Sequence, residues 1–213
     1  MRLNGNVEFP AVLPGFESIN RYWDARNQTI AAKILPGEYY VTSGQELITT
    51  VLGSCVSACI RDRITGVGGM NHFLLPLSPG ETWSSATEII SLANRYGNYA
   101  MEHLINDILK NGGKKNNLEI KIFGGSQIIH GMSDIGASNI EFVRNYAAVE
   151  GLDIVAADVS GTNPRKVVYY PHSGRVMVKR IRELHNSTIL KRESAYIESL
   201  GDKSQEGEIE LFN

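Results

Sequence analysis

The chain has 213 residues, of which 42% are hydrophobic and 21% are charged, and its formal net charge is −2. This length allows one well-buried core, and the near-neutral charge argues against a nucleic-acid-binding protein, which normally presents a basic face. The basic residues between positions 179 and 192 are interrupted by acidic ones, Glu183 and then Glu193, a pattern typical of a solvated surface.

Signals for membrane insertion or export are not evident. The longest apolar runs, such as 154–157, are far shorter than the ~20 residues that cross a bilayer, and the first six residues lack the apolar stretch of a signal peptide. The two cysteines, Cys55 and Cys59, form neither a disulfide framework nor a zinc-binding pattern. We therefore expect a cytoplasmic protein with no metal, no cofactor and no membrane insertion.

The first 35 residues show no sustained hydrophobic period and mix prolines, glycines and aromatic residues. We predict a flexible or surface-wrapping N-terminal extension over 1–35, whose aromatic side chains dock on the main domain. Strands are then predicted from β-branched and aromatic content at 38–42, 47–52 and 67–75, with 56–60 extended or in a short helix.

Two helices are predicted in the middle of the chain. Capping boxes at 85–88 and 138–141 indicate helix starts, because a serine and the glutamate three residues later satisfy each other's backbone N–H groups. A clearer amphipathic helix follows Gly97 and stops at the glycine pair 112–113. The second helix is expected to begin at 138 and to end before Gly151.

The rest of the chain is predicted to be mainly strands, at 118–122, 152–159, 165–170 and 175–181, the last two paired in a hairpin. Strands, helix, strand, helix and strands in this order indicate a single α+β domain with mixed strand pairing and helices on one sheet face. We assign this domain to 36–200 and expect a flexible polar tail over 201–213.

Cys55 and His72 are the candidate catalytic residues. Cys55 follows a glycine–serine turn at a strand end, and His72 comes 17 residues later, behind a second glycine turn. An imidazole can take the proton of a thiol, which becomes a nucleophilic thiolate. Backbone N–H groups at the turn, around Ser54, could hold an oxyanion, and Thr49 or Thr50 could fix the imidazole.

Other interpretations of these residues remain open. A free cysteine is often a buried core residue, and we expect this role for Cys59, which lies in an apolar run. The Gly-Gly-Ser turn at 124–126 lacks the lysine of a nucleotide-binding loop, so a tight turn beside the site is the better interpretation. Asn71, Gly125 and Ser126 are further candidates for residues that line the site.

Six blocks of sequence follow one another along the chain: Leu-Gly-Ser-Cys-Val at 52–56, Gly-Gly-Met-Asn-His-Phe-Leu-Leu-Pro at 68–76, Arg-Tyr-Gly at 95–97, Phe-Gly-Gly-Ser at 123–126, Ile-Gly-Ala-Ser-Asn at 135–139 and Arg-Lys-Val at 165–167. In this order they resemble the chemoreceptor glutamine deamidase family, CheD. Together they cover about 36–182, and the stretches 33–40 and 208–212 also resemble the longer members.

The resemblance implies a layered α/β/β sandwich and a Cys-His-Thr triad. Cys55 matches the nucleophile, His72 the base, and Thr49, six residues before the cysteine, the threonine that orients the imidazole. The implied activity is that of a protein-glutamine glutaminase, which converts glutamines on the cytoplasmic helices of methyl-accepting chemoreceptors to glutamate and releases ammonia. Such an enzyme acts in chemotactic adaptation.

Two other functions are compatible with the same residues. Some members of the family act as adaptors that bind receptors or a CheC-type phosphatase, and in such a protein the thiol would matter little. The second of these functions is that of a thiol hydrolase or transglutaminase acting on other amides.

Overall fold

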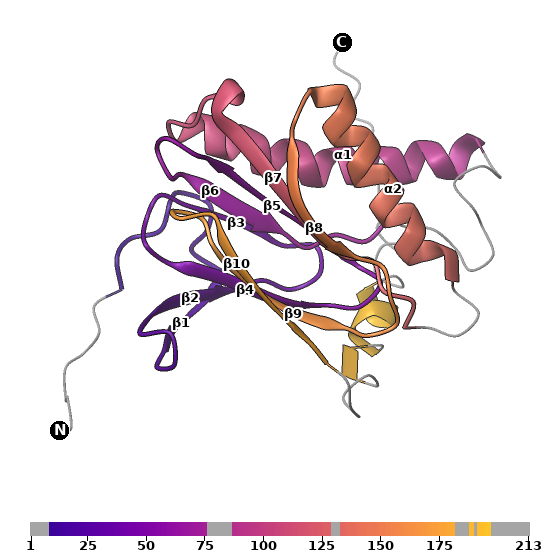
Figure 1. The fold of residues 1–213 in the computed structure, drawn as a ribbon, viewed down its shortest axis with the longest axis horizontal. Helices are drawn as coiled ribbons and strands as arrows, with labels where there is room; N and C mark the ends of the chain where they lie inside the picture. Colours follow the sequence, from indigo (N-terminus) through magenta and orange to yellow (C-terminus); the bar gives the residue numbers. More distant parts are fainter. Residues whose placement is uncertain (1–8, 76–86, 129–132, 182–187, 190, 197–213) are drawn as a thin grey trace, which may run out of the picture.

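The computed structural model describes residues 9–75, 87–128, 133–181, 188–189 and 191–196 (Figure 1). Within this part of the chain, two five-stranded sheets stack on each other. The helices α1 (Thr87–Lys110) and α2 (Ser133–Glu150) cover the outer side of one sheet (Figure 1). This confirms the expected α+β class and the α/β/β layering.

The first sheet, here called sheet A, lies on the side away from the helices. Its β2 and β4 pair in parallel, and its other neighbours pair antiparallel. The hairpin of its last two strands is the predicted one. In spatial order its strands are β1 (Asn20–Asp24), β2 (Thr29–Lys33), β4 (Leu47–Leu52), β9 (Arg165–Tyr170) and β10 (Arg175–Arg180).

The second sheet, sheet B, lies between sheet A and the helices. Helix α1 packs on β3, β6 and β5, and α2 packs on β5, β7 and β8. A 3₁₀ turn, η1 (Lys115–Asn117), leads into β7, and β5 is a strand throughout. In spatial order its strands are β3 (Tyr39–Thr42), β6 (Gly68–Asn71), β5 (Val56–Asp62), β7 (Leu118–Gly124) and β8 (Ile154–Val159).

The alternation of side chains along β4 decides what faces the core. Ile48 and Leu52 belong to the large cluster between the layers, whereas Leu47 packs with Ala31 on the outer face of sheet A. Because successive side chains of a strand point to opposite faces, Thr50 shares the inner face with Ile48.

The segment 1–35 contributes more regular structure than we predicted. Both β1 and β2 lie in it and pair with the rest of sheet A; strands of five residues are too short to give a clear period. Phe16 is buried and makes edge-to-face contacts with Tyr39 and Tyr40, each at 5.3 Å between ring centroids. The expected docking of aromatic residues is thus observed for Phe16, and the domain boundary at 36 stays a prediction.

The predicted helix starts differ from the observed ones or begin outside the described residues. Helix α1 passes through Gly97, where an added Cβ would lie 2.5 Å from Cζ of Phe142, so the missing side chain lets α1 approach α2. Helix α2 begins at Ser133, and the proposed capping box at 138–141 lies inside it. The other capping box, at 85–88, begins outside the described residues, as does the predicted tail.

Candidate functional site

The turn from Gly53 to Cys55 carries the chain from β4 in sheet A to β5 in sheet B. The N–H of Gly125 donates to the carbonyl of Cys55 at 2.8 Å, and that of Ser126 donates to the carbonyl of Gly53 at 2.7 Å. At Gly124, with φ of 111°, an added Cβ would lie 2.1 Å from the Cys55 carbonyl oxygen. The glycine turn after β7 (124–126) therefore packs against the cysteine turn (53–55) and fixes its position, as the Gly-Gly-Ser sequence suggested.

Asn139 of α2 holds the same turn from the helical layer, and our sequence interpretation did not single it out. Its amide donates to the Ser54 carbonyl at 3.0 Å, and its side-chain oxygen accepts from the N–H of Leu75 at 2.8 Å. Both partners are backbone groups, so Asn139 helps to fix the path of the chain.

His72 follows β6 directly and faces the cysteine. Its backbone N–H donates to Glu38 O at 2.9 Å, and its carbonyl accepts from Gly37 N at 2.7 Å. Donor atoms of Cys55, His72 and Glu193 lie within 4.8 Å of one another. The structure thus brings together the cysteine and histidine that we paired from the sequence. Cys59 is buried in the core, as expected.

Thr50, and not Thr49, contacts the imidazole, so our assignment of Thr49 to this position is wrong. The Thr50 hydroxyl lies 2.7 Å from His72 Nδ1, whereas the Thr49 hydroxyl donates to the carbonyl of Val167 at 2.9 Å. The reason is the alternation of β4, which turns Thr49 to the outer face of sheet A.

The contacts of Thr50 also decide which ring nitrogen of His72 carries the proton. The Thr50 hydroxyl has one hydrogen and lies 2.8 Å from the Ile34 carbonyl, which can only accept. Both contacts are satisfied when Thr50 donates to Ile34 and accepts from Nδ1–H of His72. Nε2 then carries a lone pair, and among the described residues it has no hydrogen-bond partner.

Asn71 does not line the site as we expected. Its side chain accepts from the N–H of Ala58 at 2.8 Å and donates to the carbonyl of Ala100 at 3.1 Å. Residues 71 and 72 follow each other in an extended segment, so their side chains point in opposite directions. Asn71 therefore ties β6 to β5 and to α1.

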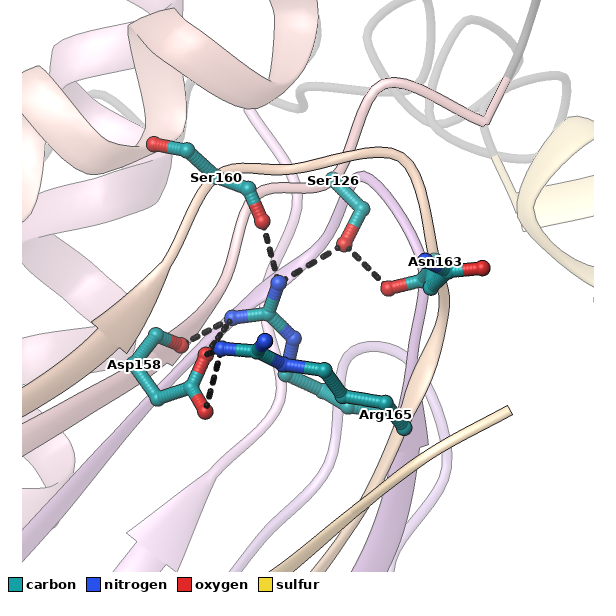
Figure 2. Close-up of polar contacts among 6 residues, drawn as sticks. Ser126, Asp158, Ser160, Asn163 and Arg165 are labelled. Atoms are coloured by element: carbon teal, nitrogen blue, oxygen red, sulfur yellow. Dashed lines mark hydrogen bonds and ion pairs between the residues drawn. The ribbon is translucent and has the colours of Figure 1, made fainter. Parts of the chain in front are cut away.

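Ser126 belongs to a polar cluster behind the turn (Figure 2). Its hydroxyl donates to the carbonyl of Asn163 at 2.8 Å and accepts from Arg165 at 3.1 Å. Arg165 is buried and also bonds the carboxylate of Asp158 at 2.8 Å and the carbonyl of Ser160. Since Arg165 lies on β9 and Asp158 on β8, the cluster joins the two sheets next to the Gly125–Ser126 turn.

Glu193 occupies the centre of the site, although we interpreted its surroundings as a solvated surface. It is only 1% exposed. Its carboxylate accepts from the backbone N–H groups of Gly53 at 2.9 Å, Ser54 at 3.0 Å and Cys55 at 3.3 Å. The Ser54 hydroxyl adds a fourth hydrogen bond at 2.5 Å. The N–H groups that we expected to hold an oxyanion therefore hold this carboxylate.

Burial keeps the two reactive groups uncharged at neutral pH. It raises the pKa of the Cys55 thiol well above its ordinary value, and the nearby Glu193 carboxylate raises it further. Burial also lowers the pKa of His72 to about 3. A thiolate–imidazolium pair is thus disfavoured while Glu193 is in place.

Cys55, His72 and Glu193 offer three ligand atoms of the kinds that bind metals. The carboxylate oxygens, however, already accept four hydrogen bonds, and a cation at this point would face the positive ends of backbone N–H groups. The donors thus suit an anion or a carbonyl oxygen. Beside His72 lies a pocket of about 240 Å³, whose lining includes Thr50, Lys33, Lys166 and Arg192.

A thiol, an imidazole with a free lone pair and converging N–H donors are the groups needed for acyl transfer from an amide. The arrangement is that of a cysteine-based amidohydrolase. Among the residues that the structure describes, none of the helices is long and apolar enough to cross a membrane.

Comparison with known proteins identifies the family. Residues 74–180 match the family model described as CheD chemotactic sensory transduction. The chain is 53% identical, over 203 residues and 95% of each chain, to a protein of Hahella chejuensis (strain KCTC 2396) named probable chemoreceptor glutamine deamidase CheD. A protein of the same name from Halorhodospira halophila (strain DSM 244 / SL1) is 49% identical over 209 residues, or 98% of this chain and 97% of the relative. The chain belongs to the CheD family.

Proposed function

We propose that this protein is a protein-glutamine deamidase that converts glutamine side chains of methyl-accepting chemoreceptors to glutamate in chemotactic adaptation. The observation that carries the proposal is the identity of about half of all positions, over nearly the whole chain, to proteins named chemoreceptor glutamine deamidases. The grouping of Cys55, His72 and Thr50 supplies chemistry that fits this activity.

In the first half of the reaction, Nε2 of His72 takes the proton of the Cys55 thiol and the sulfur attacks the amide carbon of glutamine. The oxygen becomes negative and is held by the N–H groups of Gly53, Ser54 and Cys55, once they are vacant. The C–N bond then breaks, His72 gives its proton to the leaving ammonia, and a thioester remains.

In the second half, His72 removes a proton from water, which attacks the thioester and releases glutamate and the thiol. Thr50 keeps Nδ1 protonated and thereby keeps the lone pair on Nε2, the role that we first assigned to Thr49. No cofactor or metal takes part in these steps. Each new glutamate adds a negative charge to the receptor helix.

The proposal extends to the setting of the enzyme. We expect the 36–200 domain to act in the cytoplasm on the cytoplasmic helices of the receptor, with a CheC-type phosphatase as a further partner and without nucleic-acid binding or membrane insertion. Copurification of the full chain with a receptor fragment, with and without a CheC-type protein, tests these partners.

The activity is tested with a receptor cytoplasmic fragment and mass spectrometry. Wild-type protein should produce the mass increase of an amide converted to an acid at particular glutamines. Cys55→Ala and His72→Ala should each reduce the rate by a factor of at least about 10²–10⁴, the range of a lost nucleophile or base. Full activity of Cys55→Ala would contradict the mechanism.

The complete burial of Cys55 favours one second candidate, the non-catalytic adaptor. In that case Cys55→Ala would keep receptor binding and chemotactic signalling unchanged, and the wild-type protein would release no ammonia. Ammonia release measured with free glutamine, peptides and receptor also separates a general amidase from a receptor-specific enzyme, and incorporation of an added amine would reveal a transglutaminase.

A further inference from the structure

A short helical segment closes the site. It consists of residues 188–189 and 191–196 and is called the docked helix below. Ile189, Glu193 and Tyr196 are spaced by four and three residues, which places them on one helix face. Ile189 and Glu193 are buried and Tyr196 packs against the core, while the other described side chains of the segment are exposed. The docked helix thus binds through one face.

The contact made by Glu193 is specific to its carboxylate. Three consecutive backbone N–H groups and the Ser54 hydroxyl donate to its two oxygens. At Gly53, an added Cβ would lie 2.7 Å from Glu193 Oε1, so the close approach requires a glycine there. The carboxylate lies within 4.8 Å of the donor atoms of Cys55 and His72. This is the place where the proposed reaction forms its product, which is itself a glutamate side chain.

We propose that Glu193 is an internal mimic of the reaction product, so that the free protein is self-occluded and a substrate helix must displace the docked helix. The inference rests on the proposed function, because only for glutamine deamidation is a glutamate the product.

The occlusion follows from the surroundings of the nucleophile. Cys55 has no exposed surface and His72 is 2% exposed, so a glutamine of another protein does not reach the sulfur in this state. The Glu193 carboxylate also disfavours the thiolate. Removal of the docked helix would open the site, free the N–H groups and favour ionisation of the thiol at the same time.

The docked helix also indicates how a substrate would bind. A helix presents Glu193 to Cys55, and glutamine has the same length and shape as glutamate. A glutamine on an exposed helix of the substrate would enter by the same path, with small or apolar neighbours at the positions of Ile189 and Tyr196.

The decisive variant is Glu193→Gln in the full chain, because it replaces the product mimic with a substrate. Cys55 Sγ would bond to the side-chain amide carbon of the new glutamine, ammonia would leave with a proton from His72, and water would cleave the thioester. The result is a glutamate at position 193 and a regenerated thiol. Mass spectrometry of the purified variant should show this conversion.

Two controls make the result specific. The double variant Glu193→Gln with Cys55→Ala should keep its amide. Ser194→Gln places a glutamine on the exposed face of the same helix, and it should be converted at least about 100-fold more slowly, because it is not held beside the thiol. The natural Gln28, which is exposed, provides an internal reference.

A second measurement does not depend on self-conversion. Glu193→Ala should increase the rate of Cys55 alkylation by iodoacetamide at least about tenfold relative to Ser194→Ala, since the thiol becomes accessible and ionises more readily. Fragmentation of the peptide that contains both cysteines in the mass spectrometer distinguishes alkylation of Cys55 from that of the buried Cys59. Thermal unfolding checks that each variant is folded.

The outcomes separate this inference from the proposed function. If the wild-type protein deamidates the receptor fragment but the glutamine at 193 persists and Cys55 alkylation does not change, Glu193 is a structural brace and the inference is wrong. If the glutamine at 193 is converted while no receptor fragment is, the product mimic stands and the receptor assignment fails.

Discussion

At the scale of single residues, the hydrogen bond between Thr50 and His72 decides which ring nitrogen acts as the base. With Nδ1–H donating to Thr50 and Thr50 donating to Ile34, the lone pair of the ring lies on Nε2. This is a positioning role, because Thr50 acts through His72 and not on the substrate.

Thr50→Val should lower kcat for receptor deamidation about tenfold, the value of one lost hydrogen bond of about 1.4 kcal/mol. Thr49→Val loses a hydrogen bond of similar length and should leave kcat within about twofold, because Thr49 faces away from His72. Both variants should lose similar stability in thermal unfolding. Thr50→Ser should restore kcat, and a larger kcat loss in Thr49→Val than in Thr50→Val would contradict the assignment.

At the scale of elements, the site depends on turns that are held by hydrogen bonds from several strands and from α2. The cysteine turn joins β4 to β5, the glycine turn after β7 holds it, and Asn139 of α2 holds it from above. Arg165 on β9 supports the glycine turn through Ser126 and joins it to β8 (Figure 2). The catalytic geometry is therefore coupled to the contact between the two sheets.

Arg165→Met should destabilise the protein by about 3 kcal/mol, because it removes one partner of a mostly buried ion pair. Deamidation should slow as well, since the turn beside Cys55 loses its support. Arg180 binds the same Asp158 but is 62% exposed, so Arg180→Met should cost less than about 1 kcal/mol. Urea unfolding of both variants measures the difference, and equal losses would refute the structural role given to Arg165.

At the scale of the whole molecule, burial of His72 links stability to pH. Its pKa falls from the ordinary 6.5 to about 3 on folding, because burial disfavours the charged ring. Between these values the unfolded chain binds a proton that the folded chain does not, so the free energy of unfolding decreases as pH falls below about 6.5.

From pH 7 to pH 5, wild-type protein should therefore lose about 2 kcal/mol more stability than His72→Asn, which lacks the titrating group. Urea unfolding at several pH values gives both curves. Parallel curves for the two proteins would show that His72 is already protonated in the folded state at pH 5, and hence that the site is more open than in this structure.

The local pattern of the sequence was sufficient for most of the central fold. Alternating residues in 118–122 and the hairpin at 165–181 gave strands close to those observed, and the amphipathic stretch after Gly97 gave the part of α1 that follows this glycine. The start of α2 was misplaced because a capping pattern also occurs inside this helix, and β1 and β2 were missed because each is only five residues long. Which strands pair within each of the two sheets depends on contacts between distant parts of the chain, so the order of the strands was not predictable from local sequence.

For the site, the sequence by itself determined what lies within one local unit. Cys55 and His72 come together because Cys55 precedes β5 and His72 follows β6, its antiparallel neighbour. The glycine turns around them were visible as turns. The choice of Thr50 over Thr49 depends on which face of β4 meets sheet B. Glu193 lies far along the chain, and nothing in its local sequence distinguishes it from a surface residue. Only the tertiary structure, which pairs long-range backbone donors with this one buried carboxylate, could place it in the site.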